Sequence, residues 1–185
     1  GANVHLRPKD FSGDFSPDIQ WVKDVLSQLK KSGKNYKLFS ILRPTSPFRL
    51  PGTIKEAMKC FLELSEISSL RAVQLCSEHP AKMWEINDKI MKPIFKGSND
   101  GVPWHSSQFS SLPKIYIQNA SLEISKVSNV YDKNSISGEK IIPFITNKNE
   151  GYDINSEKDW LFAEHLINNN KAELPQIRKS TYSND

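Results

Sequence analysis

The residues of this chain best suited to chemistry lie in one string, Arg43-Pro44-Thr45-Ser46-Pro47-Phe48-Arg49. Two prolines stiffen a segment that carries two hydroxyl groups and two guanidinium groups. Such a segment is suited to hold an acidic ligand with several hydroxyl groups. A rigid turn with surface arginines is the alternative that the spacing leaves open.

A second polar group comes from Asp153 and Asn155, which flank Ile154. In an extended backbone the two side chains lie on the same side, where their oxygen atoms suit magnesium, a cation that prefers hard oxygen ligands. Alternatively, Asn155 or Ser156 caps the helix that is expected next. The two roles can coexist.

Three further residues have ordinary structural explanations besides functional ones. Lys82, in the string His79-Pro80-Ala81-Lys82, is by type a solvated surface residue. His79 is either a general base or a structural residue. Asp18 stands in the first turn of an expected helix, where its charge is favourable for the helix dipole.

The elements that position these residues follow from hydrophobic periodicity. Apolar residues at spacings of three and four predict a helix over 16–33, and Thr53-Ile54-Lys55-Glu56 fits a capping box for a second helix. The apolar run 38–42 before that second helix is typical of a buried strand, and 70–75 after it is the next strand candidate. Strand, helix, strand predicts a right-handed crossover in a mainly parallel sheet, so the 43–49 loop would lie at the carboxyl edge where ligands gather.

The later part of the chain changes character. Residues 83–95 are typical of a hairpin, and a polar stretch, 96–111, follows as a loop or a lobe. Two strand-like pieces, 115–118 and 122–126, come next, and a last helix is expected over 156–167.

Composition limits the class of protein. The chain has 185 residues, 37% of them hydrophobic, which suffices for one compact domain. No apolar stretch approaches the roughly 20 residues that span a bilayer, and the first residues have no secretory signal, so we expect a cytoplasmic protein without a membrane partner. The net charge of +4 arises from interspersed charges, which argues against a nucleic-acid partner. Cys60 and Cys76 lack metal-ligand spacing and are expected to be reduced.

The string 42–49 resembles the hallmark of the acylneuraminate cytidylyltransferases (CMP-sialic-acid synthetases), a Leu-Gln-Pro-Thr-Ser-Pro-Leu-Arg-like sequence. Arg43 replaces the glutamine here, and Phe48 replaces the second leucine. The resemblance continues in order along nearly the whole chain, and ordered motifs together are more specific than any one of them. They are Leu6-Arg7-Pro8, Gly13-Asp14, Ser77-Glu78-His79-Pro80-Ala81-Lys82-Met83-Trp84, Leu112-Pro113, Gln118-Asn119-Ala120-Ser121, Gly138-Glu139-Lys140 and Asp153-Ile154-Asn155-Ser156-Glu157-Lys158-Asp159-Trp160.

The resemblance implies an α/β fold with a Rossmann-like nucleotidyltransferase sheet, mainly parallel and three-layered. One domain would span 1–185, with a small β-containing dimerisation lobe over 83–125. The family opens with a strand and a Gly-rich loop, bearing Arg and Lys, that binds the CTP phosphates, and nothing similar precedes Gly1. We therefore expect an N-terminally truncated domain, without its N-terminal strands, that binds phosphate poorly and is inactive alone.

The implied reaction joins CTP to a sialic-acid-like nonulosonic acid. The anomeric hydroxyl attacks the α-phosphate and gives a CMP-sugar and pyrophosphate, for cell-surface glycans such as lipopolysaccharide. Mg²⁺ and cationic side chains would supply positioning and charge neutralisation. The family forms homodimers, so a homodimer is expected. The alternative is a non-catalytic sugar-binding or dimerisation module. A hydrolase has little support, because the chain has no Gly-x-Ser-x-Gly nucleophile elbow.

The resemblance also assigns residue roles. Asp153 and Lys82 are the catalytic candidates: Asp153 would hold the metal together with Asn155, which replaces a second aspartate, and Lys82 would face the acid sugar. Arg7 would contact the cytosine base, and Asp18 would accept a hydrogen bond from its amino group. The residues expected to bind the sugar are Arg43, Thr45, Ser46, Arg49, Lys82 and Asn119.

Three departures from the family qualify these roles. Asn155 keeps an oxygen ligand but loses a charge, so metal affinity should fall or the contact should pass through water. Phe109 stands in a region where many relatives carry an arginine, a charge that Arg43 could supply instead. Asn119 could hydrogen-bond the sugar or, alternatively, satisfy the backbone at a strand bend.

Overall fold

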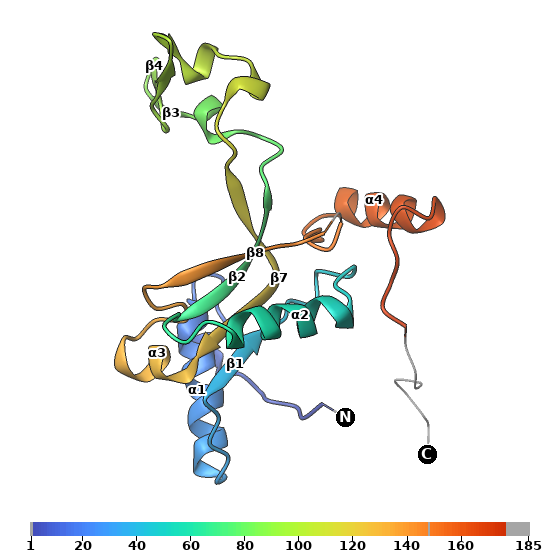
Figure 1. The fold of residues 1–185 in the computed structure, drawn as a ribbon. Coiled ribbons are helices and arrows are strands. Elements are labelled where there is room, and N and C mark those ends of the chain that lie inside the picture. Colours follow the sequence, from blue (N-terminus) through green and yellow to red (C-terminus); the bar gives the residue numbers. More distant parts are fainter. Residues whose placement is uncertain (1, 148, 177–185) are drawn as a thin grey trace. The chain divides into compact units, whose positions relative to one another are not determined.

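The chain folds as two compact units in the computed structural model, which describes residues 2–147 and 149–176. The main unit comprises Gly1–Ala72 and Asn119–Asp185, and the small unit comprises Val73–Gln118. Figure 1 labels the helices of the main unit and most of the strands of both units. Among the described residues no helix is both long and apolar enough to cross a bilayer.

A four-stranded sheet is central to the main unit. The spatial order of its strands is β1 (Leu38–Ile41), β7 (Tyr116–Lys126), β2 (Ser69–Leu75) and β8 (Ile141–Ile145). β1 and β7 are antiparallel, with Ile41 opposite Glu123. The strands predicted over 38–42 and 70–75 are therefore both present, and each is followed by a loop at its carboxyl end.

The sheet is mixed rather than mainly parallel. Lys126 N–H donates to the Ser68 carbonyl at one end of the β7–β2 pair, and Cys76 N–H donates to the Ile115 carbonyl at the other, so these strands are antiparallel. Ser68 N–H donates to the carbonyl of Lys140, which precedes β8, so β2 and β8 begin at the same end and run parallel. The predicted mainly parallel pairing is wrong for the described residues, because β7 lies between β1 and β2 and reverses direction.

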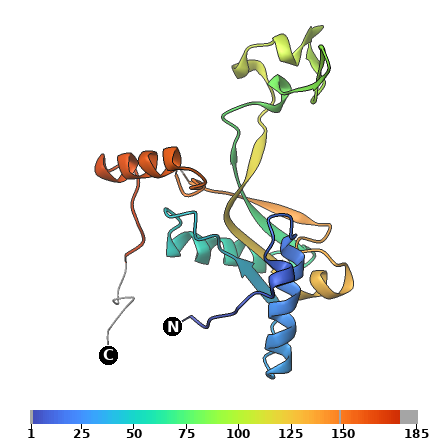
Figure 2. The ribbon, with the colours of Figure 1, turned by 180° about the vertical axis from the view of Figure 1, so that it is seen from behind.

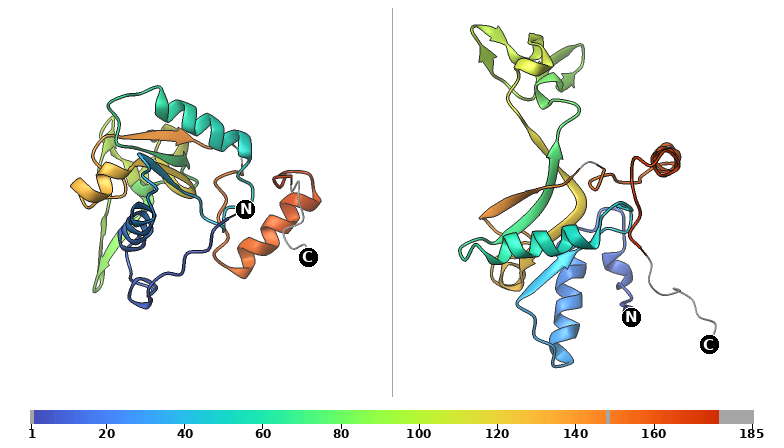
Figure 3. Two further views of the ribbon diagram at one scale, coloured as in Figure 1. Left: turned by 90° about the horizontal axis from the view of Figure 1, so that it is seen from below. Right: turned by 45° about the vertical axis from the view of Figure 1, so that its right-hand side comes forward.

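Helices cover both faces of this sheet, and the left view of Figure 3 shows α1 and α2 on opposite sides of it. The buried residues of α1 (Asp18–Lys31) pack with those of β1 and α3 (Val127–Asp132). Ala57 and Phe61 of α2 (Pro51–Leu62) pack against apolar residues of β2 and β7. The predicted α/β class is confirmed.

The expected capping box of the second helix does not form. α2 begins at Pro51, so Thr53 lies inside the first turn, where its hydroxyl donates a hydrogen bond to the buried carboxylate of Glu150. Pro51 is well placed as the first helical residue, because its missing N–H would have no partner there. Tertiary contact rather than local sequence therefore decides what Thr53 binds.

From Asn119 onward the central strand β7 is buried on both faces, although its sequence alternates. Leu122 and Ile124 belong to the apolar core beneath α2, whereas Ser121, Glu123 and Ser125 alternate with them and are also buried. Alternation usually indicates one solvent face. Here the helices on the second side cover a polar face instead, and that face leads to the candidate site.

The last helix extends the main unit beyond the sheet. Figure 2 shows the chain passing from β8 to α4 (Glu157–Asn168). Ser156 is its N-cap and accepts a hydrogen bond from Asp159 N–H, which confirms the predicted capping role. Leu166 of α4 and Phe48 of the 43–49 loop share a small apolar core.

The small unit contains the predicted hairpin, formed by β3 (Trp84–Asn87) and β4 (Ile90–Pro93) in antiparallel register. A second short pair consists of β5 (Ser98–Asn99) and β6 (Val102–Pro103). The lobe predicted over 83–125 overlaps this unit, whereas residues 119–125 belong to the main unit. A dimerisation role for the lobe stays a prediction.

Candidate functional site

The loop after β1 presents Arg43, the central cation of the candidate site. Both terminal nitrogens of its guanidinium donate to the carboxylate of Asp18, the first residue of α1. The hydrogen bond to Asp18 raises the pKa of Arg43 against the effect of burial, and the negative charges of Asp18, Glu123 and Asp153 add to this rise. Arg43 is therefore charged and held in one orientation by a bidentate, charge-assisted contact.

Asp18 joins two predicted groups of residues. Trp21 Nε1 donates to Asp18 Oδ1 at 2.7 Å, and the guanidinium carbon of Arg7 lies 4.6 Å from the centroid of the Trp21 ring. Burial disfavours the charged form of Asp18, but the hydrogen bonds from Arg43 and Trp21 and the charges of Arg43 and Arg7 outweigh it, so the pKa of Asp18 is lowered. Arg7 and Asp18, predicted for the nucleotide, thus lie in one network with Arg43, predicted for the sugar.

Arg49 fastens the loop to the sheet. Its Nη1 donates to the carbonyl of Arg43 at 3.1 Å and to the carbonyl of Ser121 on β7. Burial lowers the pKa of Arg49. Both acceptors are backbone carbonyls, so these hydrogen bonds give Arg49 a structural function. The contact of Arg49 with the sugar stays a prediction.

The two hydroxyl residues of the loop differ in exposure. The side chain of Thr45 is exposed, and its backbone carbonyl accepts a hydrogen bond of 2.9 Å from Ile154 N–H. Ser46 is only 3% exposed, and its hydroxyl has no hydrogen-bond partner among the described residues. Ser46 can therefore bind a sugar only if neighbouring residues move. The hydrogen bond to the Thr45 carbonyl holds the 153–155 segment against the loop.

Asp153 and Asn155 are adjacent, as their spacing predicted. Asn155 Nδ2 donates to Asp153 Oδ2 at 2.9 Å, and the Asn155 backbone N–H donates to Asp159 Oδ2 at 3.1 Å. Asp153 Oδ1 is buried and has no hydrogen-bond partner among the described residues. An unpaired buried carboxylate oxygen is costly without a ligand or water, so this atom fits a cation.

The donor set suits magnesium only in part. Among the described residues no group of three or more His, Cys, Asp or Glu side chains is placed to hold a metal. Magnesium, however, often uses one or two carboxylates and takes its remaining ligands from water and substrate phosphates. The oxygens of Asp153 and Asn155 fit that pattern.

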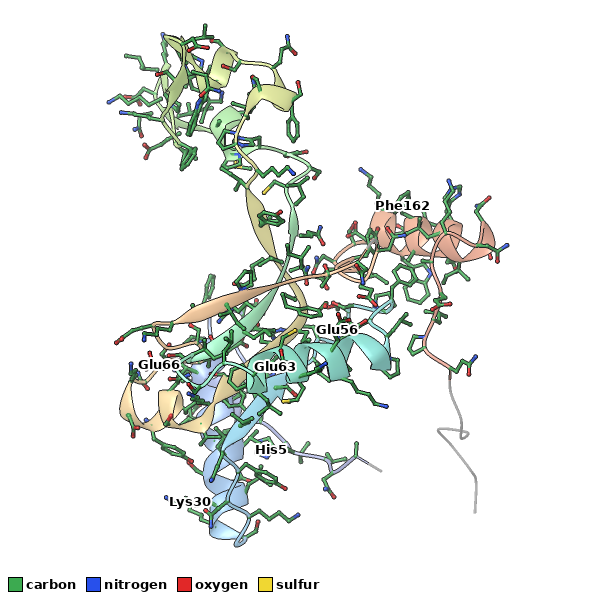
Figure 4. All side chains as sticks on the ribbon, in the orientation of Figure 1. His5, Lys30, Glu56, Glu63, Glu66 and Phe162 are labelled. Carbon is green, nitrogen blue, oxygen red and sulfur yellow. The ribbon has the colours of Figure 1, made fainter. Side chains whose placement is uncertain are left out.

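Aromatic side chains hold the 153–155 segment in place. The rings of Phe48 and Tyr152 have centroids 6.0 Å apart, and those of Tyr152 and Phe162 are 5.7 Å apart. Figure 4 labels Phe162 on α4. The Tyr152 hydroxyl also donates to the backbone carbonyl of Asp159 at 2.9 Å. These contacts connect the loop after β1, the segment after β8 and α4.

Glu123 is a buried carboxylate whose charge acts on Arg43, and it was not among the predicted site residues. It pairs with Arg71 of β2 at 3.0 Å. Burial raises the pKa of Glu123, although the charges of Arg71 and Arg43 act in the opposite direction. The available signal was the alternation in 121–125 and in 70–72, which places opposite charges on one face of neighbouring strands.

Asn119 is engaged within the protein. Its Nδ2 donates to Thr146 Oγ1 at 3.0 Å, and its Oδ1 accepts from Ser121 N–H at 3.2 Å. The structure therefore bears out the alternative, a side chain that satisfies the backbone of a strand. A sugar contact by Asn119 stays a prediction.

Lys82 lies in the small unit, and its side chain contacts residues of that same unit. Its Nζ donates to the backbone carbonyls of His105 at 2.8 Å and Ser107 at 2.6 Å. These bonds hold the loop that follows β6. The predicted catalytic role of Lys82 at the acid sugar stays a prediction.

His79 has both ring nitrogens engaged. Nε2 lies 2.9 Å from the Pro113 carbonyl, to which it must donate, and Nδ1 accepts from Ala81 N–H at 3.1 Å. These two contacts fix a neutral ring with the proton on Nε2. They favour a structural role for His79 over a general base.

Comparison with known proteins gives the following relationships. No family model matches the chain. The chain is 26% identical over 181 residues to the CMP-N,N'-diacetyllegionaminic acid synthase of Legionella pneumophila subsp. pneumophila (strain Philadelphia 1), a match that covers 94% of this chain and 73% of that protein. It is 23% identical over 179 residues to the N-acylneuraminate cytidylyltransferase of Escherichia coli O18:K1:H7, covering 95% of this chain and 40% of that protein.

Proposed function

We propose, from the relationship of this chain to the acylneuraminate cytidylyltransferases over nearly its whole length, that the protein activates a sialic-acid-like nonulosonic acid with CTP. The products are a CMP-sugar and pyrophosphate, which makes the protein a nucleotidyltransferase that acts in cell-surface glycan synthesis. One observation carries the proposal: the bond between Ile154 N–H and the Thr45 carbonyl brings an oxygen-rich segment against a loop bearing a fixed cation.

Different residues of the main unit would bind the metal and the sugar. Asp153 and Asn155 would hold Mg²⁺, which when bound neutralises phosphate charge. Arg43 would donate to the carboxylate of the acid sugar. Its guanidinium has five N–H donors, and the Asp18 carboxylate engages its two terminal nitrogens, so donors remain for a ligand. Fixed donors of this kind lower the barrier through orientation rather than through a covalent step.

The electrostatic surroundings set a condition on sugar binding. The charge of Arg43 is already opposed by the carboxylates of Asp18, Glu123 and Asp153. A sugar carboxylate would meet a less negative site once a cation neutralised Asp153. Binding of the acid sugar should therefore be stronger in the presence of Mg²⁺ than in its absence.

The proposal includes a cytoplasmic homodimer with a Rossmann-like, three-layer main unit. A cytoplasmic reaction follows from the use of CTP. The small unit would serve dimerisation, because it exposes large apolar side chains, including Ile86 at 70%, Ile90 at 68% and Ile94 at 64%. Exposed apolar residues gathered on one small unit are typical of a protein–protein interface. The role of Lys82 toward the acid sugar rests on the resemblance alone.

The alternative is a non-catalytic sugar-binding or dimerisation module. Asn155 favours it, because an amide in place of a carboxylate weakens the hold on a divalent cation. The contacts of Lys82, a catalytic candidate, with backbone carbonyls also favour it. Such a module would bind the acid sugar without releasing pyrophosphate.

The test is a pyrophosphate-release assay on the full-length protein with CTP, Mg²⁺ and, in turn, neuraminate, legionaminate and pseudaminate derivatives. We expect turnover with at least one of them and loss of turnover in Asp153→Ala with the fold intact by circular dichroism. Asp132→Ala, at an exposed position at the end of α3, is the matched control. Binding of an acid without turnover would identify the sugar-binding module. Neither binding nor turnover would refute both the synthetase and the sugar-binding module.

A further inference from the structure

Asp18 has contacts that differ from those expected of a base-binding residue. Its Oδ1 accepts hydrogen bonds from Trp21 Nε1 at 2.7 Å and from Arg43 Nη1 at 3.4 Å, and its Oδ2 accepts from Arg43 Nη2. Both oxygens are thus engaged by the protein. A cytosine amino group would have to compete with a guanidinium for the same carboxylate.

The Asp18 carboxylate is itself rigidly held. Asp18 and Trp21 are three residues apart on α1, so they lie on one side of the helix. The indole bond fixes the plane of the carboxylate, and the Trp21 ring is in turn covered by the guanidinium of Arg7. Val22, the next residue of α1, is buried against the sheet, which anchors the helix that carries this arrangement.

The Arg43 side chain, unlike the Asp18 carboxylate, is flexible by nature. An arginine side chain has several rotatable bonds and loses much rotamer entropy when it is ordered. Arg43 lies in the loop after β1, and the bond from Ile154 N–H to the Thr45 carbonyl holds the 153–155 segment against that loop. The contact with Asp18 orders the guanidinium before any ligand arrives.

We infer that Asp18 is a positioning residue for Arg43 and does not itself bind nucleotide. This inference rests on the proposed function. Asp18 acts on the acid sugar through Arg43, by presenting the free guanidinium N–H groups in a fixed direction. The carboxylate fork and the planar guanidinium match each other, so lysine cannot replace Arg43 in this pair.

The test is a double-mutant cycle in the full-length protein, with KM values for the acid sugar and for CTP measured separately. Asp18→Asn, Arg43→Gln and the double variant form the cycle. Asp24→Asn is the matched control, because Asp24 is also a partly buried carboxylate on α1, paired with His5 at 3.1 Å.

We expect Asp18→Asn to raise KM for the acid sugar about tenfold, the size of effect typical for loss of a charge-assisted contact. KM for CTP should stay within about twofold of the wild-type value. In the Arg43→Gln background Asp18→Asn should add nothing, because its only route to the sugar is then absent. Asp24→Asn should leave both constants unchanged.

Other results would overturn the inference. A rise in KM for CTP that Asp18→Asn produces in both backgrounds would mean that Asp18 contacts the nucleotide. Additive effects on KM for the sugar, or no effect of Asp18→Asn, would mean that the pair does not act as a unit. If the wild-type protein makes no CMP-sugar, the proposed function fails and this inference fails with it, whereas an active wild type with an uncoupled cycle removes only the inference.

Discussion

Gly138→Ala tests how tightly the loop before β8 packs against α3. Gly138 has a φ of +68°, and a Cβ added there would lie 2.6 Å from Asn129 Oδ1 and 2.6 Å from Ser68 Cβ. Asn129 cannot move away at no cost, because its Nδ2 donates to the Ser68 carbonyl and to Ser125 Oγ, both at 2.9 Å. The substitution therefore combines backbone strain with a steric clash.

The expected loss of stability follows from these two contributions. An alanine held at positive φ is destabilised by about 1 kcal/mol relative to glycine. Displacement of Asn129 weakens two hydrogen bonds of a buried amide, each of which contributes about 1 kcal/mol. We expect Gly138→Ala to lower the free energy of unfolding by about 3 kcal/mol.

Urea denaturation followed by circular dichroism measures this loss, and two other glycines separate its causes. Gly33 has a φ of +81° at the end of α1 with no atom within 4 Å of an added Cβ, so Gly33→Ala should show only the strain, about 1 kcal/mol. Gly52, in α2, has neither a positive φ nor a near neighbour, so Gly52→Ala should be neutral or slightly stabilising. The reasoning is refuted if Gly138→Ala costs no more than Gly33→Ala.

Three further predictions concern the site and the small unit. Asn155→Asp places a second carboxylate beside Asp153, so half-maximal pyrophosphate release should need less Mg²⁺ than in the wild type; an unchanged Mg²⁺ requirement would argue against a metal site there. Because Arg43 and Trp21 lower the pKa of Asp18 despite burial, the stability that Asp18 contributes is complete above its unfolded pKa of about 3.9 and is lost as the pH falls through the lower folded pKa. Asp18→Asn should therefore make the free energy of unfolding less dependent on pH in this acid range, and identical pH profiles for the two proteins would contradict the ion pair. His79→Ala leaves the Pro113 carbonyl and the Ala81 N–H without their partner, so we expect a loss of about 2 kcal/mol in the free energy of unfolding with kcat of the folded protein unchanged; lost turnover at unchanged stability would instead identify a general base.

Several local features could be predicted from the sequence because their causes are local. The periodicity of α1, the hairpin of β3 and β4 and the cap at Ser156 depend on residues within a few positions of each other. The spacing of Asp153 and Asn155 likewise placed their side chains together. The ordered motifs indicated the family to which the comparisons relate the chain.

Features that depend on distant partners could not be predicted in this way. The sequence order of β1, α2 and β2 gave no sign that β7 would lie between the two strands, because strand pairing is decided by long-range contacts. Thr53 matched a local capping box, yet it binds Glu150, which is 97 positions away. Propensity is a weak guide wherever a tertiary partner is available.

The sequence by itself determined which residue types the site would contain and that Arg43 would follow a strand, although β1 is an edge strand in which only Ile41 is buried. Only the tertiary structure decided which partner each side chain would have: Asp18 for Arg43, backbone carbonyls for Arg49 and Lys82, and the strand backbone for Asn119. The physical reason is that a charged or polar side chain finds its lowest free energy with whichever complementary group the fold brings within hydrogen-bond distance. Composition and spacing do not show which groups the fold brings within that distance.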